Sequence, residues 1–210
     1  IAPELTTQGA IKLRVPESHS AYAINEALHE SPSLEVLSDL RPLGQLHDSF
    51  IVAAGRDGLW LIDQHVAHER ILFEQILNQR AQRRVEKQTL LMPMILELSA
   101  AQQIEYARIA DELIAMGFET EPFGNRTIAI KAAPGGISAV DIENAVMEVL
   151  EVAEGEMRKA SIDDVRRQIA ASFACRAAIK INTRLDTLRM EWMLTALAKT
   201  QYPMSCPHGR

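Results

Sequence analysis

Positive charge, cysteine and long apolar runs are all scarce in this chain of 210 residues. Its formal net charge is −6, with 22 Lys and Arg against 28 Asp and Glu. That excludes the cation excess with which free-standing nucleic-acid binders neutralise phosphates. No apolar run approaches the roughly 18 to 20 residues of a membrane span, and no signal-peptide pattern opens the chain. We therefore expect a soluble cytoplasmic protein without a membrane partner, whose DNA contacts are local or borrowed.

Two familiar catalytic signatures are missing as well. The segment Gly55-Arg56-Asp57-Gly58 is too short for a Walker phosphate loop, which argues against ATP binding within this chain. His-Val-Ala-His-Glu at residues 65–69 matches neither zinc-peptidase helix motif. Because the chain begins at Ile1 without an initiator methionine, we expect it to be a piece of a longer protein.

The hydrophobic pattern predicts that strands are followed by a helix after an N-terminal arm. Residues 1–38 mix Pro, Ser, His and Glu with little periodicity and resemble a linker. Alternation then predicts one strand over residues 44–54, a tight turn at 55–58 and a returning strand at 59–62. After Asp63 the apolar period lengthens to about 3.6, which predicts a helix that reaches Arg84.

The middle of the chain reads as an edge strand or crossover, followed by more helices. This segment, Thr89–Leu98, is interrupted by Pro93. Ser99 and Gln102 form the pattern of a capping box, and Gly117 marks the end of the helix that they open. The remaining elements that we expect are a hairpin over residues 118–133 and helices over 141–153, 161–180 and 186–199.

This order predicts an α/β (α+β) fold with two subdomains. We expect residues 39–85 and 172–210 to form one subdomain, and residues 86–171 to form an inserted helix-and-hairpin subdomain. The metal-binding residue types fall in the first subdomain only, as a discontinuous domain with an insertion would place them.

Three of those residues surround the start of the helix expected after Asp63. His65 and Glu69 are four apart, so on a helix both project from one face and can reach one ion. Asp63 can act as a further ligand or can orient a histidine. The alternative is an ordinary polar helix N-terminus.

Soft donors occur further along the chain. Cys175 lies in an apolar Ala-Cys-Arg-Ala-Ala run, and Cys206 lies two residues before His208. A mixed sulfur, nitrogen and oxygen set suits zinc, manganese or a pair of ions. One disulfide, or two plain buried thiols, are the alternatives.

A local cluster of cations follows the first motif. Arg80, Arg83, Arg84 and Lys87 lie within eight residues. They could contact DNA, or they could simply complement the negative pole of the helix dipole.

Three motifs in order resemble one known family. The segment Asp63–Glu74 is similar to the Asp-Gln-His-Ala-x-x-Glu-x4-Glu motif of the C-terminal endonuclease and dimerisation domain of DNA mismatch-repair MutL proteins. Ala174-Cys175-Arg176 and the ending Cys206–Arg210 resemble the other two motifs of that family. The resemblance covers roughly residues 39–210, with Val66 in place of the family's alanine.

The resemblance implies a homodimer that nicks duplex DNA with bound metal ions. It implies a catalytic role for Asp63 together with His65 and Glu69, and it leaves the role of Glu74 open. It also implies a regulatory or structural Zn²⁺ and a catalytic Mn²⁺, the mismatch-recognition protein MutS as a partner of the full-length protein, and a nucleoid-associated location. The metal ligands that it implies are His65, Glu69, Cys175, Cys206 and His208.

A fourth segment resembles the sequence by which such proteins contact the replication sliding clamp. Gln88, Leu91 and Pro93 occupy the positions of that Gln-x-x-Leu/Ile-x-Pro motif. A buried edge strand would explain Leu91 and Pro93 equally well. Clamp binding would supply the DNA affinity that a chain of charge −6 lacks.

The alternative function is a non-catalytic dimerisation module with a structural zinc site. A closed tetrahedral site with four protein ligands would favour that function, whereas an open or two-ion site would favour nicking.

Overall fold

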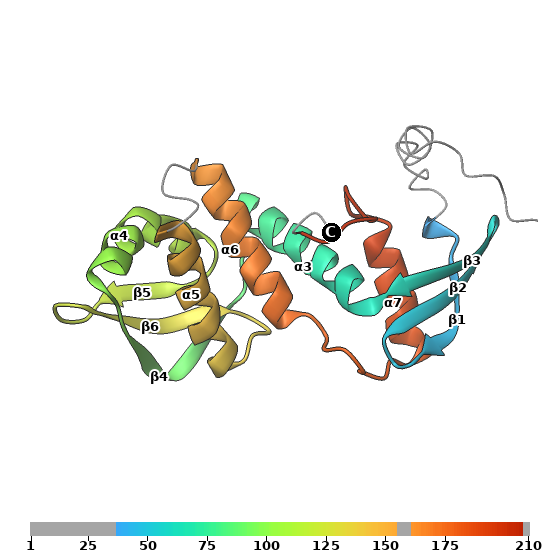
Figure 1. Cartoon of the computed structure of the whole chain (residues 1–210), viewed down its shortest axis with the longest axis horizontal. Coiled ribbons are helices and arrows are strands. Elements are labelled where there is room, and N and C mark those ends of the chain that lie inside the picture. Colours follow the sequence, from blue (N-terminus) through green and yellow to red (C-terminus); the bar gives the residue numbers. More distant parts are fainter. Residues whose placement is uncertain (1–36, 155–160, 208–210) are drawn as a thin grey trace, which may run out of the picture. The chain divides into compact units, whose positions relative to one another are not determined.

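The computed structural model describes residues 37–154 and 161–207 (Figure 1). The expected arm, apart from its last two residues, and the predicted ligand His208 lie outside the described residues. The elements are β1 (Arg41–Leu46), β2 (Phe50–Gly55), β3 (Gly58–Asp63), α3 (Gln64–Ala81), β4 (Lys87–Glu97), α4 (Ala100–Ala115), β5 (Glu119–Pro122), β6 (Thr127–Pro134), α5 (Ala139–Glu154), α6 (Ile162–Ala177) and α7 (Thr187–Leu197).

Two antiparallel sheets make this an α+β fold. One sheet has the order β1-β2-β3 and the other has the order β4-β6-β5. Every strand pairing in the described residues is antiparallel, so no parallel βαβ unit is required here. The boundaries of the inserted subdomain remain a prediction.

The first sheet corrects one prediction. The single strand predicted over residues 44–54 is wrong, because the chain turns between β1 and β2 and pairs Leu46 with Phe50. His47 and Asp48 both adopt left-handed backbone angles, with φ of 52° and 46°. Turns with this backbone usually contain Asn-Gly or Asp-Gly. His-Asp is not such a pair, so the sequence did not indicate a turn here. The following hairpin, in which Gly55 pairs with Gly58, is confirmed.

Helix α3 begins where the sequence predicted, and it ends earlier. Asp63 is its N-cap, and its Oδ1 accepts hydrogen bonds from the backbone N–H groups of His65 (2.9 Å) and Val66 (3.1 Å). The last helical residue is Ala81 instead of Arg84, because Arg83 adopts a left-handed conformation that no helix can continue.

Strand β4 is an edge strand of the second sheet, as expected. Its pairing jumps from Thr89 opposite Ala132 to Met94 opposite Ile130. The segment 90–93 therefore bulges out of the ladder opposite a single residue of β6.

The later helices and the second hairpin are confirmed, except that α6 ends at Ala177 instead of residue 180, because Ala178 is extended. Ser99 accepts a hydrogen bond from the Gln102 N–H (3.1 Å), while the Gln102 side chain accepts one from the Ser99 N–H (2.9 Å). This reciprocal pair is the predicted capping box, and Gly117 follows the helix with a positive φ of 99°.

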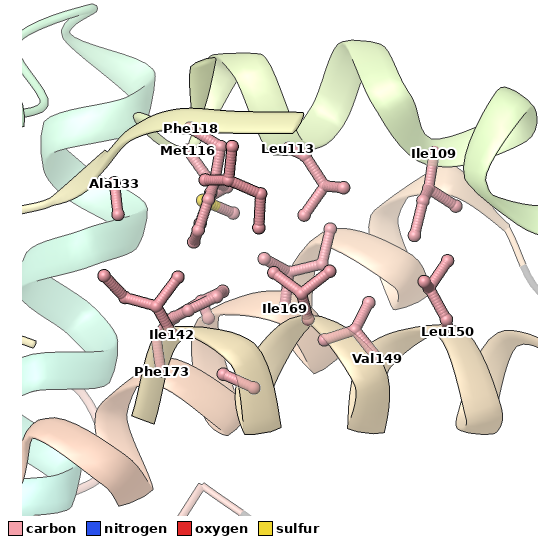
Figure 2. Packing of buried hydrophobic residues seen from close by; sticks show 14 of the residues in the cluster. Ile109, Leu113, Met116, Phe118, Ala133, Ile142, Val149, Leu150, Ile169 and Phe173 are labelled. Carbon is pink, nitrogen blue, oxygen red and sulfur yellow. The ribbon is translucent and has the colours of Figure 1, made fainter. Parts of the chain in front are cut away.

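Two hydrophobic clusters hold the elements together. Figure 2 shows side chains of α4, α5 and α6 pointing toward one another in the larger cluster. The ring centroids of Phe118 and Phe173 lie 4.7 Å apart there, with the ring planes tilted by 44°. The smaller cluster joins β2, the start of α3 and α7. Helix α3 serves both, because Phe73 belongs to the first and Ile71 to the second.

No helix in the described part of the chain is both long and apolar enough to cross a bilayer.

Candidate metal centre

The first turns of α3 bring His65 against Glu69. The distance from His65 Nε2 to Glu69 Oε1 is 3.2 Å, and the Glu69 side chain is only 10% exposed. On the other side of the ring, His65 Nδ1 lies 2.7 Å from the carbonyl oxygen of Ile179. Because a carbonyl only accepts, Nδ1 is the donor in this contact. Nε2 is therefore the ring nitrogen that faces the Glu69 carboxylate.

Helix α6 brings Cys175 to the same carboxylate. Burial, a hydrogen bond with Glu69 and the charge of that carboxylate raise the pKa of Cys175 to about 12. Cys206 is buried and close enough to act electrostatically on Cys175. The two cysteines are not joined by a disulfide.

Arg70 holds the segment that carries Cys206. Its Nε donates to the Ser205 carbonyl (2.7 Å), and its Nη2 donates to Ser205 Oγ (3.2 Å) and to the Cys206 carbonyl (2.6 Å). Burial lowers the pKa of Arg70, and the neighbouring Glu74 opposes that shift. Sequence reasoning missed Arg70, since only its burial distinguishes it from a surface arginine on a helix.

The structure gives Glu74 a role that the sequence left open. Its carboxylate accepts hydrogen bonds from the backbone N–H groups of Gln201 (2.8 Å) and Tyr202 (3.3 Å), and it lies 3.7 Å from Arg70. Glu74 therefore anchors the residues that lead to Cys206.

His68 is a second residue that the sequence did not single out. Its Nδ1 accepts a hydrogen bond from the Ile179 N–H (3.0 Å), and its ring packs edge-on against Trp192. Burial and the nearby His65 lower the pKa of His68. A neutral ring is the form that can accept from Ile179.

The chemistry of these donors fits zinc. Two thiols, an imidazole nitrogen and a carboxylate are ligands that zinc takes in proteins. Within residues 37–154 and 161–207, no three such side chains are gathered as a metal ion would hold them. The ligand set predicted from sequence thus has His65, Glu69 and Cys175 linked through Glu69, with Cys206 beside Cys175.

The predicted clamp segment has one partly buried hydrogen bond and one exposed tip. Gln88 donates to the Ile137 carbonyl (2.6 Å). Leu91 is fully exposed and Met92 is 80% exposed, and Pro93 is exposed with them. A buried edge strand, the alternative interpretation of this segment, does not describe Leu91.

Comparison with known proteins identifies the family. Residues 43–185 match the model of the MutL C terminal dimerisation domain. The chain is 64% identical over its full length to the DNA mismatch repair protein MutL of Solibacter usitatus, where it covers 32% of that protein. It is also 56% identical over 174 residues to MutL of Koribacter versatilis, covering 83% of this chain and 27% of that protein.

The chain therefore belongs to the family of MutL C-terminal dimerisation domains of DNA mismatch repair. It spans about a third of the length of the relatives that it matches, at 32% for the Solibacter protein.

Proposed function

We propose that this domain is a metal-dependent endonuclease that nicks duplex DNA during mismatch repair, as a homodimer within a longer MutL protein. One observation carries the proposal. Two helices far apart in sequence, α3 and α6, bring His65 and Cys175 to one carboxylate, that of Glu69. A buried carboxylate shared by an imidazole and a thiol costs folding free energy that ordinary core packing would avoid.

Each side chain has a distinct part in that chemistry. His65 and Glu69 would hold a catalytic ion, and Cys175, Cys206 and His208 would complete the set of donors. When bound, a divalent ion lowers the pKa of its water to near neutrality and stabilises negative charge on the scissile phosphate.

Asp63 is our candidate for proton transfer with the attacking water. Its Oδ1 is fixed by the two backbone N–H groups at the start of α3. The carboxylate therefore keeps one orientation beside His65 while the rest of the turn positions the ligands.

The proposal assigns different roles to two metal ions. Thiolates favour Zn²⁺, so the two cysteines are the donors of a regulatory or structural zinc. Carboxylate and water suit Mn²⁺, which we assign to catalysis through Glu69.

The homodimer would form through the outer face of the first sheet. Leu59 and Leu61 of β3 are 74% and 59% exposed, and they alternate with Trp60 and Ile62, which pack against the smaller core cluster. A strand that is apolar on both faces is typical of a sheet covered on both sides. A second copy of the domain can supply that cover.

Partners would supply the DNA affinity and the location. We propose that the exposed tip at Leu91 docks on the replication sliding clamp, and that the full-length protein receives MutS at mismatches. Both partners act in the cytoplasm on nucleoid DNA. A clamp already on DNA raises the local concentration of substrate for a weak DNA binder.

A nicking assay tests the nuclease. The full-length protein, with sliding clamp and Mn²⁺, should convert supercoiled circles into open circles, and Asp63→Asn should abolish conversion. Asp57→Asn, a similar change in a surface turn, should leave the rate unaltered. Equal conversion by wild type and Asp63→Asn would refute the assignment.

A non-catalytic dimerisation module with a structural zinc remains the second candidate. The buried thiol of Cys206, which acts electrostatically on the half-buried Cys175, favours a closed sulfur-rich site. Stoichiometric zinc in a protein that stays inert with clamp and Mn²⁺, and that unfolds at lower temperature once zinc is removed, would establish this function.

A further inference from the structure

The end of helix α3 is built with an arginine where helices usually place glycine. The Arg83 N–H donates to the Arg80 carbonyl (3.0 Å) and the Arg84 N–H donates to the Gln79 carbonyl (2.8 Å), with Gln82 as C-cap. This is the Schellman pattern, in which the residue after the cap is left-handed and most often glycine. Arg83 takes that conformation with a φ of 55°, at a steric cost that glycine would avoid.

A depression of about 430 Å³ opens beside this helix end. Lys87 at the start of β4 contributes a second exposed cation to it, and the end of α4 forms its apolar wall. Its lining residues are Arg80, Arg83, Val85, Lys87, Ile114 and Ala115.

Arg80 is already neutralised. Its Nε and Nη2 donate to the two carboxylate oxygens of Glu112, at 2.5 Å and 2.8 Å, and Glu112 also accepts from Arg166 (2.8 Å). The cluster of four cations seen in the sequence therefore reduces to three that are available.

Those three cations are Arg83, Arg84 and Lys87, and all are exposed. None forms an ion pair with a carboxylate in residues 37–154 or 161–207. The intervening Glu86 lines a different depression. On a chain of net charge −6, this is a local positive field with no partner among the described carboxylates.

We propose that Arg83, Arg84 and Lys87 bind the phosphodiester backbone of duplex DNA that runs along α3. This inference rests on the proposed nuclease, because it gives that site a substrate path. From Glu69 to its end at Ala81, α3 rises by about 18 Å. That length corresponds to roughly five base pairs at about 3.4 Å each, so the cluster just beyond the helix end contacts phosphates about five or more base pairs from the scissile bond.

A purely structural role of the same charges predicts a different outcome. Cations at a helix C-terminus stabilise it through the dipole, so their removal would lower the melting temperature. If the charges contact DNA, their removal should lower DNA affinity and leave the melting temperature unchanged. Arg83→Gly removes a charge and also relieves the left-handed strain, so the melting temperature should not fall while DNA affinity does.

The test is DNA binding by the full-length protein as a function of salt, measured by fluorescence anisotropy with a duplex. The triple variant Arg83→Gly, Arg84→Gln, Lys87→Gln should bind at least about tenfold more weakly at low salt. Its plot of log affinity against log salt should be shallower by roughly 0.9 for each phosphate that the variant no longer neutralises. Arg83→Lys, which keeps the charge, should bind like wild type.

The matched control removes the same charge from cations that already have partners. The control is the triple variant Arg126→Gln, Lys131→Gln, Arg189→Gln, whose cations pair with Glu97, Glu121 and Asp186. It should keep the wild-type slope of log affinity against log salt. Equal losses in both triple variants would mean that only net charge matters, and an unchanged slope with a lower melting temperature would assign the cluster to helix stability. Either result overturns the inference.

Failure of the nuclease would be seen separately. Asp63→Asn should bind DNA with the wild-type slope and fail to nick. Loss of nicking without loss of binding thus concerns the metal centre, and loss of binding in the triple variant concerns the basic cluster.

Discussion

His68 and Ile179 are joined by a hydrogen bond of 3.0 Å from the Ile179 N–H to the imidazole Nδ1. The carbonyl of the same residue lies 2.7 Å from His65 Nδ1. One residue of main chain therefore links two histidines, and its carbonyl selects the tautomer of the proposed ligand. Through that link, we expect His68 to act on the proposed metal centre as a positioning residue.

Loss of this link should weaken metal binding without removing a ligand. His68→Ala should lower zinc affinity by about 10 to 100 fold, as for other groups that support ligands. His68→Asn, whose Oδ1 can accept from Ile179, should retain most of it. Competition with a chromophoric chelator measures both, and equal affinity of His68→Ala and wild type would show that Ile179 is held without His68.

The Glu112 carboxylate should make stability depend on acid pH. Burial alone would raise its pKa, but hydrogen bonds from Arg80 and Arg166 outweigh burial and lower the pKa below the ordinary 4.5. A lowered folded-state pKa contributes stability above the unfolded value, and that contribution disappears as pH falls through the folded value.

Glu112→Gln should therefore cost roughly 1 to 3 kcal/mol of unfolding free energy near neutral pH and less in acid. Urea unfolding between pH 7 and pH 3 measures this difference. The control is Glu97→Gln, because Glu97 forms an exposed ion pair with Arg126 at 3.6 Å. This change should alter stability little at any pH. A destabilisation by Glu112→Gln that is the same at both ends of the range would contradict the pairing.

Arg70 should be irreplaceable by lysine. Three donors of its guanidinium reach Ser205 and Cys206 at once, and a single ammonium cannot reproduce that fork. We expect Arg70→Lys to lose roughly 1 to 3 kcal/mol of stability. Amide hydrogen exchange should accelerate at residues 201–206, while a surface control, Arg56→Lys, should leave it unchanged.

Charge placed on the outer face of β3 should split the dimer. Leu59→Lys puts a cation at a position that is 74% exposed in one chain, so it should leave the fold intact and yield monomers in analytical ultracentrifugation. If Leu59→Lys remains dimeric, the interface lies elsewhere.

A variant at Leu91 should do the converse: it should lose clamp binding and keep the dimer. Its side chain is fully exposed on the bulge of β4, so Leu91→Ala should cost little stability and leave the dimer intact. Clamp binding, measured by surface plasmon resonance, should weaken about tenfold or more if this residue is a hot spot. Leu59→Ala should leave clamp binding unaltered.

Local sequence signals predicted elements well where the residues that define a turn or a helix end lie close together in the chain. Ser99 with Gln102, and Gly55 opposite Gly58, are such cases, since the partners lie within a few residues. The turn at His47 and Asp48 escaped because neither residue type requires a left-handed backbone. The sequence left Leu91 open between a clamp contact and a buried edge strand, because its exposure follows from a register jump against β6 that no local pattern records.

In the candidate site, too, contacts within one helix could be predicted and contacts between distant segments could not. His65 and Glu69 could be paired from their spacing on one helix, and the structure confirms that they meet at 3.2 Å. The contacts of Arg70 with Ser205 and of His68 with Ile179 span more than a hundred residues. Spacing along the chain cannot reveal such contacts, because they depend on how α3, α6 and the C-terminal segment pack.

Helix α3 contributes Phe73 to one hydrophobic cluster and Ile71 to the other. If either cluster loses its packing, apolar residues of α3 become exposed to water. The helix would then be only partly buried, even where it still packs against the remaining cluster. The two cores should therefore melt in one cooperative transition, with coincident signals from Trp60 and Trp192 fluorescence and from far-ultraviolet circular dichroism. Exchange of the α3 amides should then report the global free energy of unfolding, and a chain severed within this helix should leave neither half folded.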